Sequence, residues 1–266
     1  MTSSRRLADL RAPEISERLG PGSVIVQPVG AVEQHGPHLP FNTDLIVAEA
    51  AAAALVDRHG DEHDLWLLPA LPYSKSNEHA WSAGSIWFGP ETMLAMLRDL
   101  GRSIATLPCR RLVFLNGHGG NSSLLNVACR ELRLHNGLLT FLAHPQVPRD
   151  QGGPSYEHEL GMGIHGGMGE TSMMLHLRPD LVDMSKADRW IPESLTANDH
   201  VRFGGSVTFG WLSNDWFDEG VIGDPRTATA EHGRELFDAA VANLGRAMAE
   251  VAAYTAGPAG EPGANG

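Results

Sequence analysis

Apolar residues occur along this chain in two alternating patterns. Short continuous runs typical of buried strands lie at 23–29, 65–71, 111–116 and 138–143. Segments with helical spacing lie between and after them, at about 43–57, 90–105, 121–135, 170–177 and 228–254. Strands that alternate with helices indicate a mostly parallel sheet whose connections cross over through the helices. The pattern therefore predicts a single α/β domain with helices flanking the sheet.

Two helix starts can be placed more closely. Thr43 precedes the apolar run from Leu45, so we expect Thr43 to cap that helix and Asp44 to open its first turn. Pro90 begins another run, at the first helical position that proline favours.

Composition agrees with a soluble protein of one domain. The 266 residues are 42% hydrophobic, which suits a well-buried core over residues 1–256. The Gly/Pro-rich stretch 257–266 lacks apolar residues, and we expect it to be disordered. No run of eighteen apolar residues and no secretory signal are found, and two cysteines give no disulfide framework, so a cytoplasmic location is expected. The net charge of −12 disfavours nucleic-acid and membrane partners.

The first candidate site follows the run at 23–29. Glu33 and His35 are two residues apart and point the same way if the backbone is extended, and Asp44 follows nine residues after His35. Two carboxylates and an imidazole at the end of a strand are typical of a divalent-metal site. A polar loop that happens to contain His and Glu is the alternative interpretation.

Two later loops strengthen the metal hypothesis. His118 follows the run at 111–116 among glycines, and Gly119 would let a ligand approach the backbone closely. A third glycine-rich loop carries His165 and leads into a helix-like run that contains Glu170. Open α/β sheets place their sites beyond the carboxyl ends of the strands, so these three loops are expected to meet there.

The motifs in these loops resemble those of the creatininase family of metal-dependent amidohydrolases. They are EQHGPHLP at 33–40 with Asp44, NGHGGN at 116–121, and HGG at 165–167 followed by ETS at 170–172. The late loop GVIGDP at 220–225 also resembles the family's, and together the motifs span the whole domain. The resemblance implies a three-layer α/β/α fold, a binuclear metal centre, hydrolysis of a C–N bond in a small amide substrate, and a homohexamer.

By this resemblance, Glu33 and His118 bind one metal ion, His35 binds the other, and Asp44 bridges the two. Creatininase itself has a second-metal glutamate two residues after the histidine of its NGH motif, where this chain has Gly120. We therefore expect Glu170 to be the substitute ligand and to take part in catalysis. Two divalent ions, zinc, manganese or iron, would activate a water molecule as the nucleophile at neutral pH.

Further residues are candidates for contacts with the substrate. His165 could protonate the leaving nitrogen or hold the substrate carbonyl, or it could only order its loop. The other candidates are Glu78, His79 and Gly119, together with Trp211 and Trp216, whose alternative role is packing at a subunit interface.

The substrate stays open at this point. Gly120, and a stretch 145–164 without tryptophan, disfavour creatinine as the preferred substrate. A peptidase that trims a short peptide and a non-catalytic, metal-dependent domain that binds a small ligand are the alternatives.

Overall fold

Four parallel strands form the centre of the molecule. The computed structural model describes residues 4–146 and 156–256. The strands are β1 (Val24–Val29), β2 (Leu65–Leu67), β3 (Arg111–Asn116) and β4 (Leu139–Ala143), in the spatial order β2–β1–β3–β4. All neighbouring strands are parallel, so their carboxyl ends meet at one edge of the sheet.

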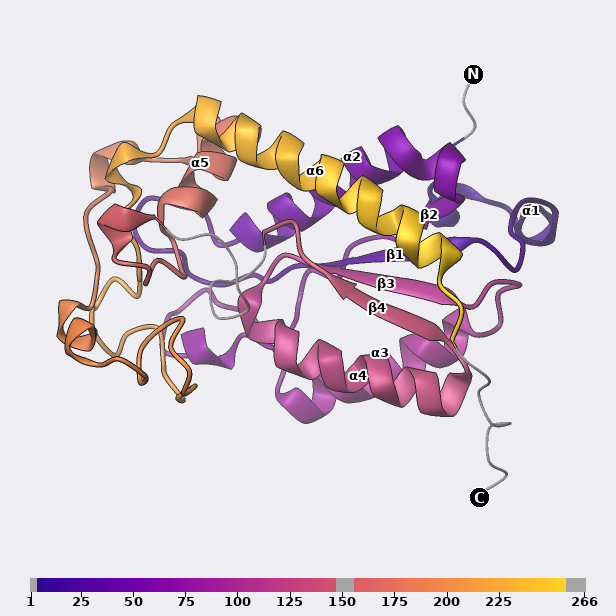
Figure 1. The fold of residues 1–266 in the computed structure, drawn as a ribbon, viewed down its shortest axis with the longest axis horizontal. Coiled ribbons are helices and arrows are strands. Elements are labelled where there is room, and N and C mark those ends of the chain that lie inside the picture. Colours follow the sequence, from indigo (N-terminus) through magenta and orange to yellow (C-terminus); the bar gives the residue numbers. More distant parts are fainter. Residues whose placement is uncertain (1–3, 147–155, 257–266) are drawn as a thin grey trace.

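Helices cover both faces of this sheet (Figure 1). One face carries α2 (Thr43–His63), α5 (Met168–Leu177) and α6 (Ala230–Ala253), and the other carries α3 (Pro90–Ile104) and α4 (Ser122–Asn136). The short helix α1 (Ala12–Arg18) lies outside these layers. The predicted parallel α/β fold with three layers is confirmed.

Side-chain alternation in β1 explains the two hydrophobic layers. Val24 and Val26 pack toward α2 and α6, whereas Ile25 packs toward α3 and α4. All three side chains are fully buried, as expected for a central strand that is covered on both faces.

Several element boundaries differ from the prediction. Strand β2 ends at Leu67 rather than at 71, and Pro69, which has no N–H for a sheet ladder, follows closely. Helix α2 continues to His63 and ends where Asp64 adopts a left-handed conformation (φ 49°). The predicted cap is wrong: Asn42 precedes the helix, and the Thr43 hydroxyl donates to the Pro40 carbonyl. Pro90 begins α3 as predicted.

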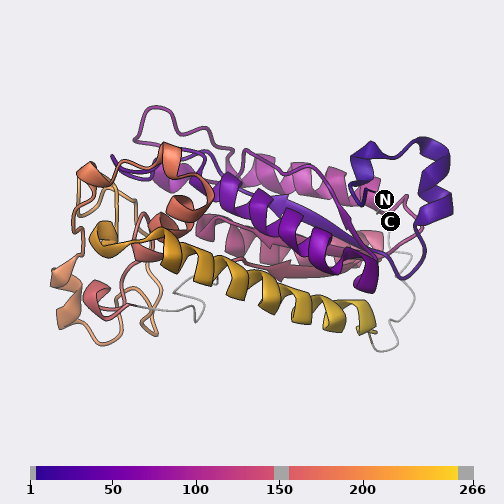
Figure 2. The same ribbon diagram turned by 90° about the horizontal axis from the view of Figure 1, so that it is seen from above.

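The segment 178–229 has no long helix or strand. Its short 3₁₀ turns and loops gather beyond the carboxyl ends of the strands, at the end of the molecule opposite α1 (Figures 1 and 2). A small hydrophobic cluster of Met162, Ile191, Phe203 and Ile222 holds it together. A single antiparallel bridge from His165 to Ile222 joins it to the loop before α5, and another from Trp190 to Gly223 links two parts of the segment itself.

Two predictions fall partly or wholly outside the described residues. The tail 257–266 and part of the glycine-rich stretch before His165 are not described. Within 4–146 and 156–256, no helix is both long and apolar enough to cross a membrane.

Candidate metal centre and substrate cavity

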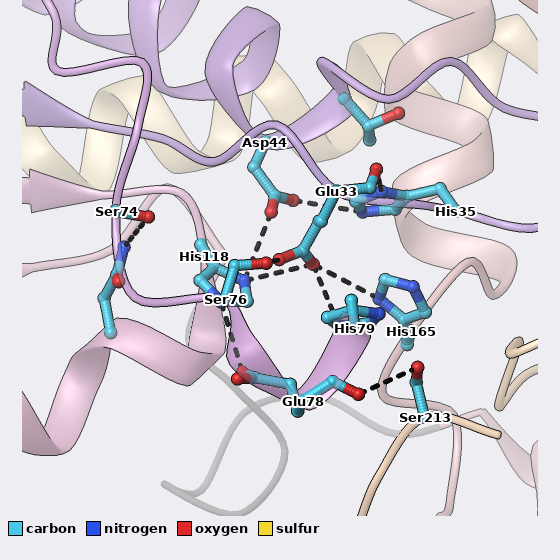
Figure 3. Close-up of polar contacts among 12 residues, drawn as sticks. Glu33, His35, Asp44, Ser74, Ser76, Glu78, His79, His118, His165 and Ser213 are labelled. Atoms are coloured by element: carbon cyan, nitrogen blue, oxygen red, sulfur yellow. Dashed lines mark hydrogen bonds and ion pairs between the residues drawn. The ribbon is translucent and has the colours of Figure 1, made fainter. Parts of the chain in front are cut away.

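The predicted ligands converge beyond the strand ends (Figure 3). Glu33 and His35 lie in the loop after β1, and Asp44 lies in the first turn of α2. His118 follows β3, while His165 and Glu170 come from the loop before α5 and from its first turn. These polar side chains are surrounded by one another rather than by water, since at most 5% of each residue is exposed for Glu33, His35, Asp44, His118 and His165.

Glycines allow this convergence. A Cβ on Gly117 would lie 2.5 Å from the Asp44 carbonyl oxygen, so only glycine lets the end of β3 pack so closely against the first turn of α2. That approach brings His118 beside Asp44. Gly36 has φ +73°, and a Cβ there would lie 2.2 Å from Val221, so the turn after His35 also needs glycine.

The Asp44 carboxylate lies between two histidines. Its Oδ1 is 3.2 Å from His35 Nε2, and its Oδ2 is 3.2 Å from His118 Nδ1. Glu33 Oε1 is also 3.2 Å from His118 Nδ1. Two groups of possible ligands therefore share Asp44, one with Glu33 and His118 and the other with His35.

Two carboxylate oxygens in this cluster lack a hydrogen bond. Glu33 Oε1 and Asp44 Oδ2 are buried and have no hydrogen-bond partner among the described residues. Both nevertheless face His118 Nδ1 at 3.2 Å. Ligands of one tetrahedral zinc ion, each about 2.0–2.1 Å from the metal, lie about 3.3 Å apart. The three atoms Glu33 Oε1, Asp44 Oδ2 and His118 Nδ1 are therefore spaced as ligands of one shared cation would be. Carboxylate oxygens and an imidazole nitrogen are donors that suit a divalent metal ion.

Glu170 completes the second group. Its Oε2 accepts the Gly166 N–H at 2.6 Å and lies 4.0 Å from His35 Nε2. Burial raises the pKa of this carboxyl to about 7, and the negative charges of Asp44 and Glu33 add to the effect. A bound cation would relieve this crowding of carboxylates, so Glu170 is placed as a ligand would be.

The histidines of the two groups carry raised pKa values. Burial by itself lowers the pKa of His35, but the Asp44 carboxylate overrides it and raises the pKa to about 10. Burial by itself would also lower the pKa of His118, but the carboxylates of Glu33 and Asp44 raise it well above the usual histidine value. The raised pKa values favour the protonated, positively charged forms of both imidazoles beside these carboxylates.

His79 and His165 differ from these two. Burial lowers the pKa of both well below the usual histidine value, and neighbouring imidazoles lower it further. His165 Nε2 is 2.7 Å from the Gln34 carbonyl, so this nitrogen carries the hydrogen and Nδ1 carries the lone pair. Nδ1 lies 3.8 Å from Glu33 Oε1, and His79 Nε2 lies 3.2 Å from the same oxygen. Both rings thus lie next to the candidate metal-binding cluster.

A cavity of about 380 Å³ opens from the cluster. The cavity is lined by the predicted contact residues Glu78, His79, Gly119, His165 and Trp211, together with the carboxylates of the candidate metal ligands. Trp216 is not among the lining residues and packs behind the wall against Phe203 and Phe209, with ring centroids 5.4 and 6.3 Å away. Trp211 therefore stands where a substrate contact can occur, and Trp216 supports the wall.

A family model described as "Creatininase: Creatinine amidohydrolase" matches residues 8–248. The chain belongs to the creatininase family. With it, the chain belongs to the metal-dependent hydrolases that act on amide bonds.

Relatives with this fold have several activities. The mycofactocin precursor peptide peptidase of Mycobacterium ulcerans (strain Agy99) is 37% identical, over 89% of this chain and 87% of its own. A zinc–zinc form of a creatininase mutant is 26% identical and has a TM-score of 0.71, covering 94% of this chain and 98% of that one. A manganese creatininase is 25% identical with a TM-score of 0.70, covering 93% and 98%.

The structure shows what occupies the space at Gly120, where creatininase itself has its glutamate. A Cβ on Gly120 would lie 1.8 Å from Glu78 Oε1 and 2.4 Å from His118 Nε2. The missing side chain thus lets the Glu78 carboxylate reach His118 Nε2, at 3.3 Å, while its other oxygen binds Lys75 Nζ at 2.5 Å. Burial by itself would raise the pKa of Glu78, but His118 and Lys75 lower it to about 2.

This contact changes the interpretation of Glu78. When one ring nitrogen of a histidine binds a metal, the other nitrogen often donates to a carboxylate, which fixes the orientation of the ring. Glu78 is in that position relative to His118 Nε2. The Lys75 carbonyl, 3.1 Å from the same Nε2, acts in the same way. In this creatininase-family site Glu78 therefore lies beside a candidate ligand as well as in the cavity wall.

Sequence reasoning missed several residues that hold the site. Gln34 connects His79 and the Gly220 carbonyl through its amide nitrogen and His165 through its backbone carbonyl, and Ser76 donates to Glu33 Oε2. His38 was not missed: the sequence suggested that it orients the site rather than binding metal, and its Nε2 lies 3.1 Å from both the Gly166 carbonyl and Thr171 Oγ1, in the loop that carries His165 and at the start of α5. His79 was predicted only as a substrate contact, but it also lies in a group that could bind metal with Glu33 and His165. Only the adjacency of Gln34 to Glu33 and His35 in the sequence could have indicated its role.

Proposed function

We propose that this chain is a binuclear metal-dependent hydrolase that cleaves a C–N amide bond in a short peptide or peptide-like substrate. The observation that carries the proposal is the position of Asp44, one of whose oxygens faces His35 while the other faces His118. A carboxylate in this position can bridge two cations about 3.5–4 Å apart.

Each cation would have its own set of ligands. Glu33, His118 and one Asp44 oxygen would hold the first, and His35, Glu170 and the other Asp44 oxygen would hold the second. A bound pair of zinc, manganese or iron ions lowers the pKa of water toward 7 and polarises the substrate carbonyl. The zinc and manganese forms of related creatininases support the first two metals.

His165 is the candidate for proton transfer. Since its Nε2–H is held by the Gln34 carbonyl, Nδ1 is free to accept a proton during attack and to return it to the leaving nitrogen. Burial keeps the pKa of the ring low and the ring neutral beforehand, as a proton acceptor must be. A general base is thus supported more directly than the ready-protonated acid that the sequence suggested.

A peptide is favoured over creatinine for two reasons. The peptidase of M. ulcerans is 37% identical to this chain. In addition, Gly120 takes the place of creatininase's glutamate, and residues 202–211 add the apolar side chains of Val207, Phe209 and Trp211 to the wall of the described cavity. Membership of a hydrolase family disfavours the non-catalytic alternative.

The test combines metal analysis with a substrate panel. Protein purified without chelators is expected to contain about two metal ions per chain, as measured by elemental analysis. It should hydrolyse N-acetylated peptides faster than creatinine, formamides or lactams, and lose activity with a chelator until metal is restored. Less than one metal per chain would contradict the binuclear site, and the absence of hydrolysis for every amide would contradict the function.

Assembly and location stay predictions. A homohexamer is expected from the family resemblance, and sedimentation velocity would measure it. A cytoplasmic location is expected from the composition of the chain, and fractionation of cells would test it.

A further inference from the structure

The end of the cavity away from the metal-binding cluster is formed by residues 202–211, which we call the outer wall. Arg202, Val207, Phe209 and Trp211 line the cavity from this segment. The carboxylates Glu33, Asp44 and Glu170 line the same cavity. A substrate whose amide reaches the cluster must therefore place another part of itself against the outer wall.

One lysine, Lys75, and one arginine, Arg202, are among the residues that line the described part of the cavity. Lys75 is neutralised by Glu78 at 2.5 Å. Arg202 Nη2 donates to the Leu160 carbonyl at 2.7 Å, but no carboxylate within 4–146 and 156–256 lies within ion-pair distance of the guanidinium. Since arginine has five N–H donors, the contact with Leu160 leaves most of them available to a ligand in the cavity that Arg202 lines.

The backbone holds Arg202 in this position. The next residue, Phe203, is 6% exposed and packs against Phe209, Trp211 and Trp216, with ring centroids 5.2–5.4 Å away. The Arg202 carbonyl accepts the Gly205 N–H at 2.9 Å, in a tight turn where Gly204 has φ +73°. Arg202 therefore extends from an anchored turn, which lowers the entropic cost of binding a ligand.

We propose that Arg202 binds a free carboxylate on the amide substrate, which makes the preferred substrate class an acid such as a peptide with its own C-terminal carboxylate. This inference rests on the proposed hydrolysis of amide bonds. The planar guanidinium matches a carboxylate through two parallel N–H donors. Val207 and Phe209 beside it suit an apolar side chain next to that carboxylate.

The test uses a matched pair of substrates, Ac-Ala-Ala-Phe with a free C-terminal carboxylate and the same peptide as its carboxamide. For the metal-loaded wild type, kcat/KM is expected to favour the acid by about 10- to 100-fold, the usual range for a charge-assisted contact. Arg202→Met should lower kcat/KM for the acid and leave kcat/KM for the carboxamide unchanged, so that the ratio of the two values falls close to one. Arg202→Lys keeps the charge without the planar fork and should retain part of the preference.

The control variant is Arg98→Met, on the exposed face of α3, where Arg98 pairs with Glu131. It removes the same charge from the protein and should leave the ratio unchanged. If Arg202 only clamped the Leu160 carbonyl, Arg202→Met would slow both peptides equally. That result, or a wild type that does not distinguish the two peptides, would overturn the inference.

A binding measurement separates this inference from the proposed function. Calorimetry with reduced-amide analogues of the two peptides, which cannot be hydrolysed, should show tighter binding of the acid to wild type and no preference in Arg202→Met. If acid-selective binding through Arg202 occurs without hydrolysis of any amide, the inference holds and the proposed function fails. If amides are hydrolysed but binding does not favour the acid, the proposed function holds and the inference fails.

Discussion

The cavity has an inner end at the candidate metal ligands and an outer end at the outer wall, and the two ends are formed by different kinds of structure. At the inner end, Asp44 lies in the first turn of α2 and His118 lies two residues after the end of β3, so both are held next to the regular α/β layers. At the outer end, Arg202 and Trp211 stand in a segment of turns that is held by a small cluster of its own. We infer that metal binding and reaction class depend on the regular layers, and substrate choice on the irregular segment.

The largest expected effect is at the shared carboxylate. Asp44→Asn should lose both metal ions and reduce kcat by at least about 1,000-fold, because it weakens both groups of ligands and the metals carry the chemistry. Elemental analysis and kinetics measure this. Asp57→Asn, on the exposed face of the same helix, is the control and should keep both properties. An Asp44→Asn enzyme with two metals would remove the basis of the binuclear proposal.

Glu170→Gln should lose about one metal per chain and most activity while the protein stays folded. The competing explanation is a carboxylate that only stabilises the start of α5, worth about 0.3–1 kcal/mol through the helix dipole. Glu91→Gln, in the first turn of α3, provides the matched case of a carboxylate at a helix start. If Glu170→Gln resembles Glu91→Gln in metal content and rate, Glu170 is not a ligand.

Gly120→Ala should weaken metal affinity by about 10- to 100-fold, the usual effect of disturbing a residue that orients a ligand. The added methyl would displace Glu78 and press on His118. Competition with a chelator measures the affinity. Gly20→Ala adds a methyl where nothing lies within 4 Å and should have no effect. Unchanged affinity in Gly120→Ala would mean that Glu78 does not orient His118.

Trp211→Ala should lower kcat/KM for peptides by about 10-fold with full metal content, because an aromatic wall is lost from the outer end only. Trp216→Ala, behind the wall, should lower the free energy of unfolding by about 2 kcal/mol, less than a fully buried tryptophan would. Urea unfolding and kinetics distinguish the two. A loss of metal in Trp211→Ala would show that the two ends of the cavity are not independent.

The smallest effect is expected at a third group of possible ligands, His59, Glu62 and His63 on α2. Glu62 is 70% exposed, and all three residues come from one helix. Such side chains stay hydrated and have no need of an ion. His59→Ala combined with His63→Ala should therefore leave the metal content unchanged, and a lower content would show that proximity alone is enough to bind metal here.

The regular layers and the main ligands could be predicted from the sequence. Apolar runs set the strands and helices, since burial on both faces of β1 demands a continuous apolar stretch, as Val24–Val29 largely is. Parallel strands bring their carboxyl ends to one edge, so residues after β1 and β3 had to meet there. For this reason Glu33, His35, Asp44 and His118 could be predicted as one cluster.

Only the tertiary structure decided what surrounds that cluster. Glu78 reaches His118 because Gly120 leaves room, and Gln34 connects residues that are far apart in the sequence. Arg202 and Trp211 reach the cavity from a segment with no periodic pattern, where position is set by packing around Phe203. Local sequence determines which residues are apolar or can bind metal, whereas contacts between distant loops depend on the shape of the whole fold.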